Sequence, residues 1–285
     1  MVSHGLAGSI VLTGHDPDYH AYAGINNSTG AQHINQAAIG YILDSTSNPF
    51  AASGVHEFLF VEGGIAPPGG HVDGENGLIA SGYQPGVDFE THNASDLASQ
   101  ISLLGTKYSG IVVGSDFGGI NTQSELNILN AQNSHIISFL NSGGGLYAMA
   151  ETAPPDGLAS TGLFGFLPFM VSSVVPLEQS ETGNTLTPFG LSLGLTNSDI
   201  NGNFSHNVFD STGGLSIVDT DPAGEILTLA GRGEVNADTG LVPEPGSAGL
   251  LVVGMIFALC LAAGRARKSL AALKRCAAEV HLPNQ

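Results

Sequence analysis

Apolar runs and amphipathic segments alternate along residues 9–151 of the chain. Four short apolar runs are typical of strands, at residues 9–14, 57–62, 109–115 and 146–151. Between them, apolar residues recur at helical spacing within 31–43, 95–104 and 122–140. The repeated order of strand, helix and strand predicts an α/β fold, a mostly parallel sheet with helices on both faces.

End signals support two of these helices. Ser95 is placed to cap the start of one helix, and Gly105 is placed to end it. Thr122 and Glu125 form the capping-box pattern that opens the next helix, and the glycines at 143–145 end it.

The pattern loosens after Glu151 into segments rich in Gly, Pro, Asn and Ser. Residues 215–231 are typical of a hairpin that turns at 221–224, which would add antiparallel strands at one edge of the sheet. Residues 160–213 carry no pattern that assigns them. No repeat divides the chain, so residues 5–232 are predicted to form one domain.

Charge is distributed unevenly between this domain and the end of the chain. Lys107 and Arg232 are the only cations in residues 1–264, which hold 24 acidic residues and carry a net charge of −22. The last 21 residues hold five cations and one acid, a net charge of +4. An acidic body repels phosphate backbones, which argues against nucleic acid as a partner. The acidity fits solubility outside the cytoplasm, or carboxylates that gather divalent cations.

The segment 248–264 contains 17 residues without a charge. As a helix it would be about 25 Å long, at the short end for a membrane span. Cations follow directly, so the positive-inside rule places the tail 265–285 in the cytoplasm and the acidic domain across the membrane. Prolines before the segment stop a helix from running back, which predicts a linker at 233–247.

Both cysteines, Cys260 and Cys276, lie in or after the apolar segment. The acidic domain therefore has no internal disulfide and no thiol nucleophile.

Three parts of the C-terminal region together resemble the PEP-CTERM sorting signal of Gram-negative bacterial surface proteins. They are the motif Val242, Pro243, Glu244 and Pro245, the apolar segment, and the cations Arg265, Arg267 and Lys268. The resemblance implies that an exosortase in the inner membrane is a partner and recognises the signal. The protein would then be released or attached at the cell surface, in organisms that often make exopolysaccharide.

The N-terminal residues do not contain the secretion signal that such sorting needs. Residues 1–16 have neither a basic start nor an apolar stretch of the usual length. This indicates a start site assigned too far downstream, or a truncated product.

Residues 135–151, a helix, three glycines and a strand, resemble the same step in class I glutamine amidotransferase-like (flavodoxin-like) folds. The resemblance covers residues 8–151 and implies a fold. In the catalytic members a cysteine follows this strand, whereas Met149, Ala150 and Glu151 stand here. Glutaminase activity is therefore not implied.

Candidate chemistry lies where the predicted strands end, because ligands of such sheets bind beyond the carboxyl ends of the strands. Carboxylates and imidazoles follow each predicted strand: His15, Asp16, Asp18 and His20 after the first, Glu62 after the second, Asp116 after the third, and Glu151 at the end of the fourth. Such a group could hold Ca²⁺ or another divalent cation, or pair carboxylates of unlike pKa for hydrolysis.

The same residues also fit ordinary loop chemistry. Asp16, Pro17 and Asp18 form a good turn sequence, and His15 and His20 lack a zinc-binding spacing. Further along, Ser205 and His206 resemble a nucleophile and base, but no nucleophile-elbow motif is present. Asn-rich turn chemistry explains them equally, and whether His206 joins the first group depends on the fold.

Two functions fit the sequence. The favoured one is a cell-surface or exopolysaccharide-associated protein, sorted by its C-terminal signal and without catalysis of its own. The alternative is a secreted hydrolase, with or without a divalent cation, whose site lies at the strand ends. The sequence leaves open whether the protein is an enzyme.

Overall fold

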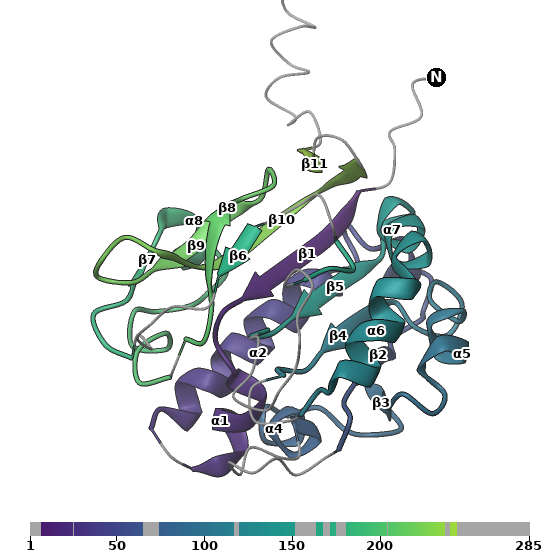
Figure 1. The fold of residues 1–285 in the computed structure, drawn as a ribbon, viewed down its shortest axis with the longest axis horizontal. Coiled ribbons are helices and arrows are strands. Elements are labelled where there is room, and N and C mark those ends of the chain that lie inside the picture. Colours follow the sequence, from purple (N-terminus) through teal and green to yellow (C-terminus); the bar gives the residue numbers. More distant parts are fainter. Residues whose placement is uncertain are drawn as a thin grey trace, which may run out of the picture. The chain divides into compact units, whose positions relative to one another are not determined.

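One mixed sheet organises the computed structural model, and within the described residues it has eleven strands (Figure 1). The structure describes residues 7–24, 26–64, 74–116, 120–151, 164–167, 172–174, 181–203, 205–236 and 240–243. Half of the sheet is parallel, in the order β3-β2-β4-β5-β1. Its strands are β1 (Gly8–Thr13), β2 (Phe58–Val61), β3 (Phe89–His92), β4 (Gly110–Val113) and β5 (Gly145–Ala148).

The other half of the sheet is antiparallel and starts at β1. The long strand β10 (Ile226–Asn236) pairs with β1 over the whole of β1, from Gly8 to Thr13. Beyond it lie β6 (Ser172–Val174), β7 (Thr185–Leu186), β8 (Val208–Ser211), β9 (Ser216–Thr220) and β11 (Gly240–Pro243). Chain segments from the two ends of the domain therefore lie side by side at the centre of the sheet.

Helices cover both faces of the sheet, as predicted. Strand residues alternate between the two faces: Leu59 and Val61 of β2 join one apolar cluster, and Phe58 and Phe60 join the other. The first cluster is completed by α5 (Leu97–Ile101), α6 (Gln123–Ala131) and α7 (Asn133–Asn141); the second includes α2 (Ser28–Ile42) and α4 (Gly74–Ala80). The other described helices are α1 (Pro17–Ala23), α3 (Pro49–Ala52) and α8 (Pro188–Ser192).

The predicted strands and helices of the first half are confirmed in type and position. One predicted helix is two: α6 ends at Ala131 and α7 begins at Asn133, without a Gly or Pro between them. The predicted hairpin is also confirmed, as β9 and β10 joined by a turn at 221–224. The antiparallel part is larger than this hairpin, because β6, β7, β8 and β11 belong to it as well.

The linker predicted for 233–247 is wrong in its first part. Strand β10 continues to Asn236, and β11 folds back on it with Gly233 opposite Pro243. The side chain of Asn141 holds this region: its Oδ1 accepts from the Val235 N–H at 2.7 Å, and its Nδ2 donates to the Val235 carbonyl at 3.0 Å. Val235 itself is buried in the core.

The chain divides into two compact units, Met1–Pro243 and Glu244–Gln285. The second unit lies outside the described residues, and with it the predicted membrane helix 248–264 and the tail 265–285. Among the helices that the structure does describe, none is long and apolar enough to cross a membrane.

Candidate functional site

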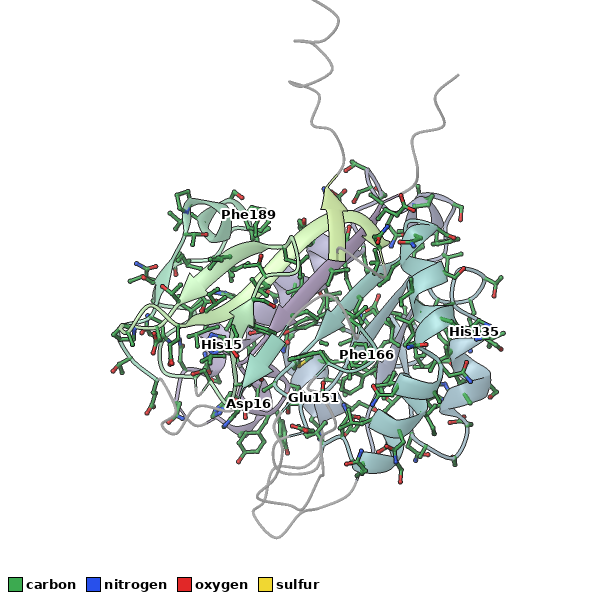
Figure 2. The ribbon with its side chains drawn as sticks, turned by 45° about the horizontal axis from the view of Figure 1, so that its top comes forward. His15, Asp16, His135, Glu151, Phe166 and Phe189 are labelled. Atoms are coloured by element: carbon green, nitrogen blue, oxygen red, sulfur yellow. The ribbon has the colours of Figure 1, made fainter. Side chains whose placement is uncertain are left out.

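The carboxyl ends of β1, β4 and β5 bring three predicted site residues to one edge of the sheet. Backbone pairing continues past the strands: the Ala150 N–H donates to the His15 carbonyl at 2.9 Å, and the Asp116 N–H donates to the Ala150 carbonyl at 3.0 Å. Figure 2 shows His15, Asp16 and Glu151 together at this end. The predicted convergence of strand ends is therefore present in the fold.

A second segment, residues 205–207, is bound alongside the first. Ser205 bridges to His15, and the His206 N–H donates to the Gly14 carbonyl at 2.7 Å. A side chain at Gly14 would overlap the carbonyl oxygen of Asn207, so only glycine permits this close crossing. Asn207 in turn accepts from the Glu151 N–H at 3.1 Å. These contacts place His206 beside the residues after β1.

Asp16 lies between two imidazoles. Its Oδ1 is 3.2 Å from Nε2 of His20, and its Oδ2 is 3.0 Å from Nε2 of His206. Asp16 occupies the N-cap position of α1 but makes no side-chain cap hydrogen bond there. All three side chains are at most 2% exposed. The Asp16 carboxylate therefore contacts the two histidine rings and does not cap the start of α1.

His15 has a different partner, Asp219 on β9, at 3.0 Å between Nε2 and Oδ2. Both residues are buried. They line a small cavity of about 20 Å³, otherwise mainly apolar, between the sheet and α2. His15 and Asp219 thus form a second buried imidazole–carboxylate pair, separate from the one around Asp16.

Asp18 binds the end of β4. Its carboxylate accepts from the Ser115 N–H at 2.7 Å, from the Ser115 hydroxyl at 2.9 Å and from the Tyr19 N–H at 3.0 Å. Burial raises the pKa of Asp18 to about 6, and the nearby charge of Asp16 adds to this, although the hydrogen bonds from Ser115 oppose it. Asp18 ties α1 to the sheet.

Glu151 at this edge has a strongly raised pKa. Burial raises it to about 8, although its Oε2 accepts from the Phe164 N–H at 2.5 Å. Phe164 has a φ of 55°, a left-handed backbone conformation that is uncommon for a bulky residue. Burial therefore favours the neutral form of the Glu151 side chain, which lies against a strained segment.

Two further predicted carboxylates, Glu62 and Asp116, follow β2 and β4. The Glu62 carboxylate accepts from the Gly74 and Glu75 N–H groups, each at 2.9 Å, at the start of α4. Asp116 is 1% exposed at the same edge as His15. The six predicted residues, His15, Asp16, Asp18, His20, Asp116 and Glu151, thus share one buried edge.

Two partners of the site, Asp219 and Ser115, were not considered as site residues in the sequence analysis. His206 was considered as a member, and Asp219 and Ser115 carried no distinguishing signal. Asp219 lies in the predicted hairpin, whose position beside the first strand could not be derived from the sequence. In the part of the chain that the structure describes, no group of three or more His, Cys, Asp and Glu side chains is suited to hold a metal ion. The divalent cation stays a prediction.

Comparisons with known proteins add little to this geometry. The chain matches no family model, and no curated protein matches it. Among solved structures, the crystal structure of the RadB recombinase has a TM-score of 0.21 and 10% sequence identity, and the alignment covers 68% of this chain and 84% of that chain. A likeness this low carries no argument about fold or function.

Proposed function

We propose that this chain is an extracytoplasmic protein, delivered to the cell surface or an exopolysaccharide matrix by a C-terminal PEP-CTERM signal, without catalysis of its own. In this proposal the 248–264 helix holds the chain in the inner membrane, and an exosortase acts on the motif Val242–Pro243–Glu244–Pro245. The acidic domain is the part that remains outside.

The boundary between the two compact units supports this proposal. The first unit ends at Pro243 and the second begins at Glu244, inside the sorting motif. Cleavage on the C-terminal side of the motif would therefore leave the sheet complete, including the β10–β11 pairing. A sorted protein needs a folded body that survives loss of its signal.

Burial of the candidate site supports the absence of catalysis. His15, Asp16, Asp18, His20, Asp116 and Glu151 are each 5% exposed or less. Asp16 and Asp219 lie against buried imidazoles, and Asp18 and Glu151 accept from backbone N–H groups, so these side chains form a polar layer between strand ends. Such a layer orders the domain without a substrate.

The sorting step is tested by mass spectrometry of the mature protein. The chain is expressed behind a functional secretion signal in matched hosts with and without an exosortase. We expect a shorter product only in the host that has the enzyme. Replacement of Glu244 by Ala, within the motif, should restore the full mass. An identical full-length mass in both hosts would contradict processing.

A secreted hydrolase remains the second candidate, because the site contains two buried carboxyl groups of unlike pKa. Asp18 is raised to about 6 and Glu151 to about 8, which gives one group that ionises near neutrality and one that keeps its proton. Screens for ester, amide and glycoside hydrolysis, with and without millimolar Ca²⁺, test this candidate. Activity that disappears in Glu151→Gln would support it; activity that is unchanged in that variant would assign it elsewhere.

A further inference from the structure

A surface groove lies at the edge of the sheet opposite the candidate site. Its walls come from the start of α3, the loop after α5 and one side of α7, all of which precede strands of the parallel half. The groove holds about 280 Å³, close to the lower limit of small-molecule sites. Figure 2 labels His135 of α7 on this side of the domain, away from His15 and Asp16.

Two aromatic rings form part of the groove. Phe50 and Phe139 are stacked, with ring centroids 5.5 Å apart and an interplanar angle of 21°. Gly105, at φ 81°, lies directly against the Phe50 ring, where a side chain would meet the ring atoms at 3.1 Å. A side chain at Gly144 would likewise overlap the Phe139 ring. Two glycines therefore make room for this aromatic pair.

Three hydroxyl groups of residues that line the groove donate hydrogen bonds to backbone carbonyls. Ser102 donates to the Ser99 carbonyl at 2.6 Å, Thr106 to the Leu103 carbonyl at 2.9 Å, and Ser142 to the Ser138 carbonyl at 2.8 Å. A hydroxyl has one proton and two lone pairs. Each of these three oxygens, on residues that line the groove, therefore keeps its lone pairs for accepting a hydrogen bond.

His135 adds a fourth acceptor. Its Nδ1 lies 2.8 Å from the Gln132 side-chain oxygen, which can only accept, so Nδ1 carries the proton of the neutral ring. Nε2 is then left with a lone pair. Among the described residues that line the groove, none is an Asp, Glu, Lys or Arg.

We infer that this groove binds a neutral saccharide. A pyranose has an apolar C–H face that would pack on the half-buried Phe50 ring, since Phe139 is only 5% exposed, and a rim of hydroxyl donors that match the four acceptors. A ligand with a carboxylate would meet acceptors without donors, within a chain whose net charge is −18. This inference rests on the proposed function, association with an exopolysaccharide matrix. The groove would bind the domain to the saccharides of that matrix.

The test is isothermal titration of the full-length chain, in a detergent without a sugar headgroup, against neutral glucose, galactose and mannose disaccharides. Matched uronic-acid disaccharides are the charged probes. We expect at least one neutral disaccharide to bind, and the charged counterpart to bind more weakly. Failure of every neutral disaccharide to bind, or tighter binding of the uronic acid, would overturn the inference.

Variants assign the binding to the groove. Thr106→Val and Ser102→Ala each remove one acceptor and should weaken binding roughly threefold to tenfold, in line with one lost hydrogen bond. Ser192→Ala is the matched control, because its hydroxyl also donates to a backbone carbonyl, that of Phe189, on a different helix. Equal affinity in all three variants would overturn the assignment. Phe50→Leu, which keeps an apolar side chain, tests the ring and should weaken binding further.

The sorting experiment and the saccharide titration test different proposals, so a negative result in one does not contradict the other. Loss of processing with saccharide binding intact would contradict the sorting proposal alone. Normal processing without binding would contradict the groove alone.

Discussion

The Oδ2 atom of Asp16 lies 3.0 Å from Nε2 of His206, although the two residues come from opposite ends of the folded domain. The same carboxylate is 3.2 Å from His20 on its other oxygen. A buried carboxylate stays stable only while it is paired. Asp16 therefore links the first strand, the first helix and the segment before β8.

Asp16→Ala should lower the free energy of unfolding by about 3–5 kcal/mol, because it removes the shared partner of two buried imidazoles. Urea unfolding followed by circular dichroism measures this. The control is His33→Ala, which removes a comparable His–Asp contact of 2.8 Å at a ring that is 51% exposed. The control should cost about 1 kcal/mol or less. Equal losses in the two variants would show that the Asp16 contacts do not stabilise the fold.

Glu151 should make the domain less stable as pH rises. Its folded pKa of about 8 lies above the ordinary value of 4.5, so between these values the folded state binds a proton that the unfolded state has lost. This contribution is complete below pH 4.5, declines by up to about 1.4 kcal/mol per pH unit, and is gone above pH 8. Unfolding of wild type and Glu151→Gln across this range measures the difference. Parallel pH profiles for the two proteins would contradict the raised pKa.

Gly14→Ala should destabilise the domain, because the new methyl group would overlap the Asn207 carbonyl and separate residues 205–207 from β1. We expect a loss of about 1–3 kcal/mol or more. Gly40→Ala is the control: Gly40 lies in α2 with open space around it, so alanine should add up to about 1 kcal/mol of stability. Thermal unfolding compares the two, and the prediction fails if both shift in the same direction.

Asn141→Leu should release the end of β10. The Asn141 amide satisfies both the N–H and the carbonyl of Val235, and their loss should cost about 1–3 kcal/mol. Hydrogen exchange should rise at Val235 and along β11, while β2 and β4 keep their protection. Asn127→Leu, an exposed helical position whose side chain accepts a hydrogen bond from Gln123 one turn away, is the control and should leave exchange unchanged. Uniform exchange across the sheet in Asn141→Leu would instead indicate global unfolding.

Patterned apolar residues explain why the parallel half could be predicted. Phe58–Val61 and Gly110–Val113 are buried on both faces, and such strands are continuous apolar runs in the sequence. In contrast, β3 (Phe89–His92) has one fully buried residue, so its sequence carries no strand signal. Asp16-Pro17-Asp18 resembled a turn and instead opens α1, where proline is favoured in the first turn.

The sequence could predict which edge of the sheet contains the candidate site, but not which side chains pair there. That parallel strands end together follows from the sheet, and it placed His15, Asp116 and Glu151 correctly. The distant partners of His15 and Asp16 depend on β10, which inserts between β1 and the rest of the antiparallel half. That insertion brings His206 and Asp219 to the first strand, and no local pattern encodes a pairing between chain segments so far apart.

Strand β11 determines how the domain would respond to a pull on its C-terminus. Strand β11 ends at Pro243, so the outermost described pair of the β10–β11 ladder, Gly233 with Pro243, would carry the load first. Ladder pairs loaded from one end open one at a time, from that pair toward Asn236 and Gly240. If the tail is held at a surface, β11 would act as a short extensible segment. It would lengthen under force before any strain reached β1 and the buried residues at its carboxyl end.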